Sequence, residues 1–251
     1  MTNAVKVALD LKLKGIAITD HYDIDAPNRE SEFSFDPIEQ QAEIERLSVE
    51  LCNGNQLEIL KGIELGLQQC SLKKIKDFAS NYKFDTIIAS VHFIDGLDPY
   101  HQSYYEGKDY IKAYSRALET IVINATKYAD FDILGHFDYI TRYRDYPVRE
   151  IRYQQFSDYL DPLLKFLARE GKALEVNTNT YRTRFNGCPN LDINILKRFK
   201  ELKGEAISLG SDAHECNRIA ENFELYSNLI KSCGFKYLAY YKDRKAQFYS
   251  I

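Results

Sequence analysis

The sequence predicts an α/β fold built on a parallel sheet, either closed into a barrel or open. Short apolar runs alternate along the whole chain with longer segments that carry apolar residues at spacings of three and four. That alternation is typical of buried strands joined by crossover helices. A chain of 251 residues with 45% hydrophobic content can bury a full core, so we expect a single domain over residues 1–251.

The predicted elements follow from these two patterns. Between the elements, two polar stretches at 28–36 and 95–108 contain turn residues and are expected to form long loops on one rim. The apolar runs predict strands and the periodic segments predict helices. The strands are expected at 15–19, 57–63, 85–91, 131–135, 173–176 and 206–210, and the helices at 37–52, 71–82, 108–128, 149–170 and 191–203.

The N-terminus departs from the pattern of a βα barrel, because it begins with a helix. Thr2 or Asn3 can cap a helix that runs to Gly15. A barrel would normally place a strand before this helix. The pattern therefore predicts an open sheet edge beside strand 15–19, unless a strand is encoded upstream of Met1.

Composition excludes several classes of partner. The formal charge of -4 is spread along the chain without a basic stripe, which argues against a nucleic-acid partner. The apolar runs are far shorter than the roughly 20 residues of a membrane span, and no signal peptide is visible. Five cysteines without a C-x-x-C pair suit free thiols. We therefore expect a cytoplasmic protein without a membrane partner.

A polar side chain of ligand type follows every predicted strand. The carboxyl ends of parallel strands meet at one rim, so these side chains should converge. A single histidine after a strand is more often a core or loop residue, but four of the five histidines occupy such positions; the fifth, His101, lies in a polar loop and is either substrate-facing or merely solvated. The strand-end residues are His21, Glu64, His92, His136, Asn177, Asp212 and His214.

Histidine and carboxylate ligands together suit a divalent ion such as zinc, manganese or iron. Glu64 is the best candidate to bridge two ions. A cluster of this kind activates water and binds phosphate oxygens, so a protein nucleophile is not required. Ser90 and Ser211 lack a nucleophile-elbow pattern, and no glycine-rich loop is present for ATP or a nicotinamide cofactor.

The ordered motifs resemble those of the polymerase and histidinol phosphatase (PHP) family. They are Thr19-Asp20-His21, Gly62-Ile63-Glu64, Ser90-Val91-His92, Gly135-His136 and Gly210-Ser211-Asp212-Ala213-His214. Within the family, the segments 90–96, 135–143, 175–178 and 234–248 are similar to histidinol-phosphatases. The resemblance implies a distorted (β/α)7 TIM-like barrel that holds up to three divalent ions.

The resemblance also implies roles for individual residues. Glu64, His92 and His136 would hold one ion, Asp212 and Glu64 a second, and His21 with His214 a third. Arginines would clamp the substrate phosphate through paired hydrogen bonds, unless they form surface ion pairs instead. The implied catalytic residues are Asp212, His214 and Arg142, and the substrate-binding residues are Arg142, Arg182, His101 and Asn177.

One family feature is absent from this sequence. Family members open with a strand that bears His-x-His, whereas residues 1–14 match the helix that follows it. We therefore expect the barrel to lack its first strand, and only the set of Glu64, His92 and His136 to be complete. A version extended upstream by that strand is expected to turn over at least about tenfold faster. A second copy of the chain or a C-terminal segment of this chain is a candidate to cover the open edge.

The resulting functional hypothesis is a metal-dependent phosphoric monoester hydrolase of the histidinol-phosphatase type, acting in histidine biosynthesis. A metal-activated hydroxide would convert histidinol phosphate to histidinol and phosphate. Two alternatives stay open. One is a PHP phosphoesterase that acts on a sugar or nucleotide phosphate, and the other is a truncated metal-binding domain with little activity.

Overall fold

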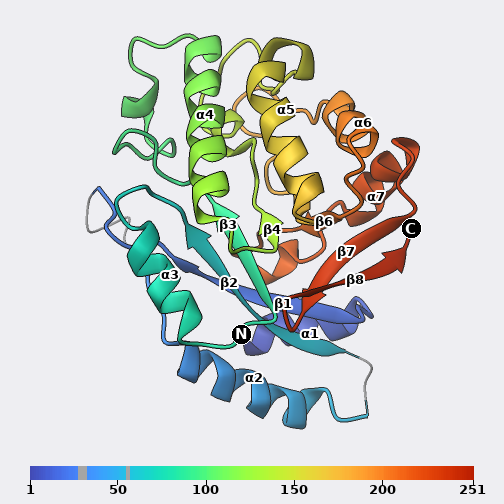
Figure 1. Ribbon diagram of the computed structural model, residues 1–251. Coiled ribbons are helices and arrows are strands. Elements are labelled where there is room, and N and C mark those ends of the chain that lie inside the picture. Colours follow the sequence, from blue (N-terminus) through green and yellow to red (C-terminus); the bar gives the residue numbers. More distant parts are fainter. Residues whose placement is uncertain (28–32, 55–56) are drawn as a thin grey trace.

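Six parallel strands form the central sheet in the computed structural model, which describes residues 1–27, 33–54 and 57–251. Their order in the sheet is the order in the sequence, and the sheet curls into half a barrel (Figure 1). The predicted α/β fold with one barrel strand missing is therefore confirmed. The strands are β1 (Gly15–Tyr22), β2 (Glu58–Gly66), β3 (Thr86–Ser90), β4 (Ile133–Leu134), β5 (Ala173–Asn177) and β6 (Ile207–Gly210).

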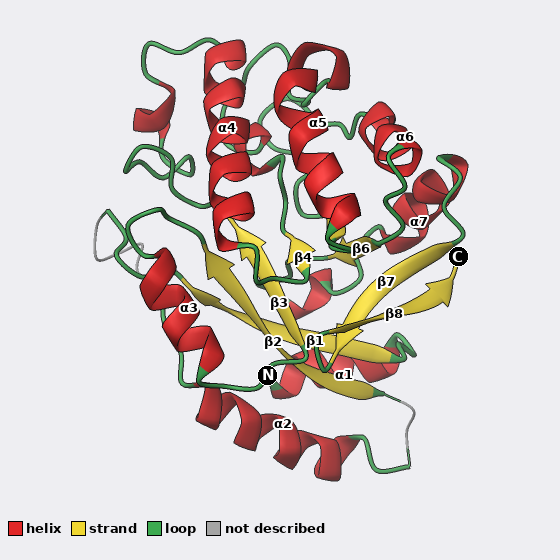
Figure 2. Cartoon of the chain, viewed as in Figure 1, coloured by secondary structure: helices red, strands yellow, loops and turns green. Residues whose placement is uncertain are grey.

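Helices connect these strands and cover the outer side of the curled sheet (Figure 2). The five helices predicted within the chain are all present, with boundaries shifted by up to four residues. Asp109 caps the longest of them, because its carboxylate accepts a hydrogen bond from the Lys112 backbone. The helices are α1 (Thr2–Asp10), α2 (Pro37–Leu51), α3 (Leu72–Ser80), α4 (Tyr110–Tyr128), α5 (Tyr153–Arg169), α6 (Ile193–Glu201) and α7 (Phe223–Ser232).

The N-terminal helix exists, but its predicted cap and length are wrong. The N-cap position is Met1, without a side-chain cap, and Thr2 lies inside α1 with its hydroxyl directed at Glu43. The helix ends at Asp10 instead of running on to Gly15. Lys12, with φ of 56°, turns the chain away from the helix axis before β1 begins.

The sheet has an open edge, as predicted. β1 and β6 are its two end strands and do not pair with each other in the described parts of the chain. The accompanying expectation of exposed apolar side chains is met only in part. Ala17 is exposed, but Ile16 and Ile18 are half-buried against the small core formed with α1 and α2.

A C-terminal hairpin lies beside the end strand β6 (Figure 1). The sequence analysis named a C-terminal segment as a candidate to cover the open edge but did not predict its two strands. It comprises β7 (Tyr237–Lys242) and β8 (Lys245–Ser250), joined at Asp243 and Arg244 with φ of 50° and 60°. These positive φ values are those of a tight hairpin turn. Arg244 pairs with Asp132 and Asp130 at the start of β4, so the turn anchors the end of the sheet remote from the strand-end residues.

The two predicted loops have different outcomes. Of the loop expected at 28–36, residues 28–32 lie outside the described part of the chain. The loop at 95–108 is present and contains the short helix η2 (Gln102–Tyr105), whose Tyr104 and Tyr105 are buried. Where the chain is described, none of its helices combines the length and apolar character needed to cross a membrane.

Candidate metal centre

Three buried side chains meet at the carboxyl ends of neighbouring strands in the middle of the sheet. Glu64 lies near the end of β2, whereas His92 and His136 follow β3 and β4. Glu64 Oε1 is 3.2 Å from His92 Nε2 and 2.9 Å from His136 Nε2, and the two nitrogens are 3.4 Å apart. We call these residues the inner set; their exposed fractions are between 4% and 8%.

The inner set fits a metal ion. Zinc–nitrogen bonds of about 2.1 Å at a tetrahedral angle place two ligand nitrogens about 3.4 Å apart, which matches the separation of His92 and His136. Burial by itself would raise the pKa of Glu64, but the imidazoles of His21, His136 and His92 outweigh burial and hold it well below its usual range. Glu64 is thus a carboxylate at neutral pH, the form that binds a cation.

Asp23, which the sequence analysis missed, supports two of the histidines. Its Oδ1 lies 2.7 Å from His92 Nδ1 and its Oδ2 lies 3.2 Å from His21 Nδ1. A carboxylate behind a metal-binding imidazole fixes the ring and leaves the other nitrogen free for the ion. A Cβ at Gly66 would lie 1.7 Å from Asp23 Oδ1, so glycine is required on β2 opposite this carboxylate.

Three further ligand-type residues lie at the two ends of the sheet, and we call them the outer set: His21, Asp212 and His214. His21 on β1 is in register with Glu64, and its Nε2 is 3.5 Å from Glu64 Oε2. The rings of His21 and His214 are 5.8 Å apart, and one potential ligand atom from each of the three residues lies within 4.8 Å of the others. The structure therefore brings all six predicted metal ligands together.

Asp212 is held by Arg142 in an unusual backbone conformation. Its φ is 45°, a left-handed value that Asp adopts more readily than most residues. Arg142 Nη1 donates to Asp212 Oδ2 at 3.0 Å, and Arg142 Nε donates to Thr180 Oγ1 at 3.0 Å. Within the described residues, Arg142 Nη2 is buried without a partner. This arginine therefore has one nitrogen left for a substrate phosphate, instead of a pair.

Glu175 on β5 is a second residue that the sequence analysis did not assign to the site. Its Oε2 accepts a hydrogen bond from the His136 backbone N–H at 2.7 Å and another from the Asn177 amide at 3.2 Å. Burial raises the pKa of Glu175 to about 7. Asn177, which the sequence analysis assigned to substrate binding, is 2% exposed. Its side-chain amide donates its hydrogen bond to Glu175 and not towards the solvent.

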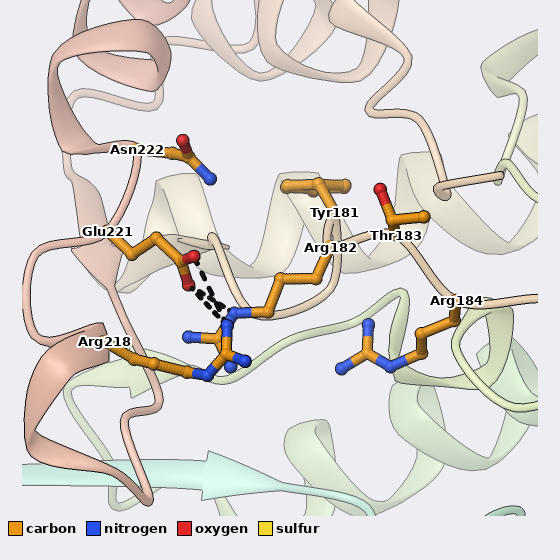
Figure 3. Close-up of a pocket in the computed structure, with 7 residues that line it drawn as sticks. All are labelled: Tyr181, Arg182, Thr183, Arg184, Arg218, Glu221 and Asn222. Atoms are coloured by element: carbon orange, nitrogen blue, oxygen red, sulfur yellow. Dashed lines mark hydrogen bonds and ion pairs between the residues drawn. The ribbon is translucent and has the colours of Figure 1, made fainter.

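Arg182 lies in a polar pocket of about 490 Å³ (Figure 3). Its Nε donates to Glu221, which also pairs with Arg218, and its Nη1 donates to Asn179 Oδ1 at 2.7 Å. Arg184 lies on the opposite side of the pocket, apart from Glu221. The pocket therefore has more guanidinium groups than carboxylates and suits an anion.

Aromatic rings extend from the inner set towards the loop at 95–108. The Tyr139 ring lies 5.2 Å from His136 and 5.1 Å from Tyr143, which in turn lies 5.1 Å from Tyr100. His101 packs edge-on against Tyr100 and is exposed. This row of rings links His101 to the metal centre.

Comparison with known proteins identifies the family. The PHP domain matches residues 1–179. The chain belongs to the PHP family. Its relatives include a probable histidinol-phosphatase of Clostridium acetobutylicum, 31% identical with 88% of this chain and 83% of the relative covered. The histidinol-phosphatase of Lactococcus lactis is 32% identical, with 93% and 85% covered.

Solved structures agree with this assignment of the PHP domain. The histidinol phosphate phosphatase of Lactococcus lactis, solved with zinc, L-histidinol and phosphate, superposes with a TM-score of 0.87 at 29% identity, over 98% of this chain and 91% of that one. A putative histidinol phosphatase of Listeria monocytogenes shares the fold, with a TM-score of 0.70 at 15% identity, over 90% and 93%.

The two residues missed in the sequence carried only weak signals. Asp23 stands two residues after His21, and an acid that near a ligand could have been tested as its support. Glu175 lies in the middle of an apolar strand, where a lone carboxylate needs a partner. Neither signal indicates which histidine the carboxylate would contact.

Proposed function

We propose that this PHP domain is a histidinol-phosphatase, a metal-dependent hydrolase that converts histidinol phosphate and water to histidinol and phosphate. One observation carries the proposal: Glu64, His92 and His136 converge within hydrogen-bonding distances beside Arg142, whose buried Nη2 has no partner in the described part of the chain. The relatives that cover most of this chain bear the same functional name.

The two ligand sets and Arg142 would have separate roles in the hydrolysis. Glu64, His92 and His136 with the outer set would hold divalent ions, which would supply a nucleophile from water and stabilise charge on the phosphoryl group. Glu64 faces both sets, because Oε1 lies near His92 and His136 and Oε2 lies near His21. Arg142 Nη2 donates one charge-assisted hydrogen bond to a phosphate oxygen. Asp212 keeps Arg142 in place, and His214 borders the solvent side of the site.

The surroundings of the inner set suit the histidinol part of the substrate. Tyr139, Tyr143 and Tyr100 form a row of rings that leads away from His136, and an imidazole can pack against such rings. Exposed His101 ends this row. We therefore assign the row, with His101, to the organic part of the ester, and Arg142 and Arg182 to its phosphate.

The polar pocket beside Arg182 favours a second candidate substrate class. Its volume of about 490 Å³ and its three guanidinium groups would accommodate the further anionic groups of a sugar or nucleotide phosphate. Histidinol phosphate has no second anionic group for these arginines.

A direct test is phosphate release from histidinol phosphate by metal-free protein to which zinc or manganese is added. We expect metal-dependent turnover that exceeds turnover of a sugar phosphate and a nucleoside monophosphate under the same conditions. Preference for either of the latter selects the second candidate. Metal binding without turnover of any ester selects a binding domain and contradicts the enzyme.

A further inference from the structure

The side chain of Asn179, in the loop after β5, lies between a predicted metal ligand and two arginines. Its Nδ2 is 3.0 Å from Asp212 Oδ2 and 3.4 Å from the Asp212 carbonyl oxygen. Its Oδ1 accepts hydrogen bonds from Arg182 Nη1 at 2.7 Å and Arg184 Nη2 at 2.9 Å. Asn179 is 8% exposed, so these contacts are shielded from water.

The partners of Asn179 determine which way its amide points. Guanidinium groups only donate hydrogen bonds, so the atom that faces Arg182 and Arg184 must be the amide oxygen. The NH2 group must then face the carboxylate of Asp212. An amide in the opposite orientation would place donor against donor on one side and acceptor against acceptor on the other.

This orientation leaves Asp212 with one oxygen for a cation. Oδ2 receives hydrogen bonds from Asn179 Nδ2 and Arg142 Nη1, each at 3.0 Å. Oδ1 is the oxygen near His214, with 3.4 Å to its Nδ1. The left-handed backbone of Asp212 persists only if surrounding contacts hold it, and Asn179 provides two of them.

We propose that Asn179 is a positioning residue that holds Asp212 as a one-oxygen metal ligand and ties it to Arg182 and Arg184. The proposal rests on the metal-binding part of the proposed function and does not depend on the substrate.

The test is zinc titration of the metal-free protein by calorimetry. Asp212→Ala and His136→Ala first identify the binding steps that depend on the outer and the inner set. We expect Asn179→Ala to weaken the Asp212-dependent step by about tenfold or more, as is usual for a residue that orients a metal ligand, and to leave the His136-dependent step unchanged. Glu221→Gln is the matched control, because it removes a charged partner of Arg182 without contacting Asp212.

Several outcomes overturn the proposal. The first two are unchanged zinc binding by Asn179→Ala, and equal weakening of both binding steps in that variant. The others are an equal loss of zinc affinity in Glu221→Gln, and the absence of an Asp212-dependent step in the wild-type protein. The unfolding temperature of each metal-free variant checks its fold. If Asn179→Ala does not fold, Asn179→Ser takes its place, and its failure to fold would show a purely structural role. If the protein binds zinc normally but does not hydrolyse histidinol phosphate, the proposed function is contradicted, whereas the role of Asn179 is not.

Discussion

The inner and outer ligand sets differ in how the fold supports them. The inner residues Glu64, His92 and His136 lie at the carboxyl ends of three neighbouring strands in the middle of the sheet and are buried. The outer residues come from the two end strands, and the side chains of His21 and His214 are 29% and 69% exposed. Strands that are paired on both sides fix their side chains by packing, whereas an end strand needs individual hydrogen bonds to do so.

The neighbouring residues show the same difference. β2 is buried along nearly its whole length, whereas no residue of β1 is buried. Asp23 holds His21 as well as the inner His92, and Arg142 with Asn179 holds Asp212. The inner set should therefore bind an ion more tightly than the outer set. Four predictions test this comparison.

The largest effect is expected from His136→Ala. Structural zinc sites gain about 10–16 kcal/mol from four ligands, so one ligand is worth roughly 3 kcal/mol or more, and zinc affinity should fall by at least about 100-fold. His214→Ala, in the exposed outer set, should leave this tight step unchanged. Calorimetric titration of both variants measures the two steps. Equal losses would show that the two sets bind as one.

The next effect is a pH dependence of stability that arises from Glu175, which accepts a hydrogen bond from the backbone of His136 in the inner set. The pKa of Glu175 is raised to about 7 by burial, from 4.5, so the folded protein binds a proton more tightly than the unfolded chain. The free energy of unfolding of the metal-free protein should therefore fall as pH rises through this range, by about 3 kcal/mol from this residue.

Glu175→Gln removes that titration and isolates its contribution. Wild type and variant should be similarly stable near pH 4, and the variant should be the more stable of the two near pH 8. Urea unfolding at both pH values measures the difference. Parallel pH profiles would show that Glu175 stays ionised in the folded protein.

A smaller effect is expected from Arg142→Ala, which alters the arginine that contacts Asp212 of the outer set. The substitution removes a donor to Asp212 and the nitrogen assigned to the phosphate, so kcat/KM for histidinol phosphate should fall by about 100-fold, or about 2.7 kcal/mol. The inner zinc step should persist. A variant with normal kcat/KM would exclude Arg142 from phosphate binding.

The smallest effect is expected from Asp23→Asn, which alters a residue shared by the two sets. Asp23 contacts both His92 and His21, so both zinc steps should weaken, each by about tenfold. Gln68→Ala, which removes hydrogen bonds to the backbone of residues 24 and 25, is the nearby control and should bind zinc normally. Weakening of only the His21 step would assign Asp23 to the outer set.

Patterns in the sequence predicted the parallel sheet, the positions of its strands along the chain and the six ligand-type residues at their ends. Apolar periodicity reports burial, and parallel strands must direct their carboxyl ends to one rim, so Glu64, His92 and His136 could be predicted to meet without any distances. An open edge beside β1 could be expected because the segment before this strand has the pattern of a helix.

The support of those residues depends on contacts that form only in the folded chain. Asp23, Glu175 and Asn179 act through partners 69, 39 and 33 residues away in the chain, and no local pattern encodes such contacts. The structure also left Arg142 with one nitrogen in place of the expected pair, because Thr180 and Asp212 take the others. Hydrogen-bond partners of buried polar groups are determined by three-dimensional packing, which spacing along the sequence does not fix.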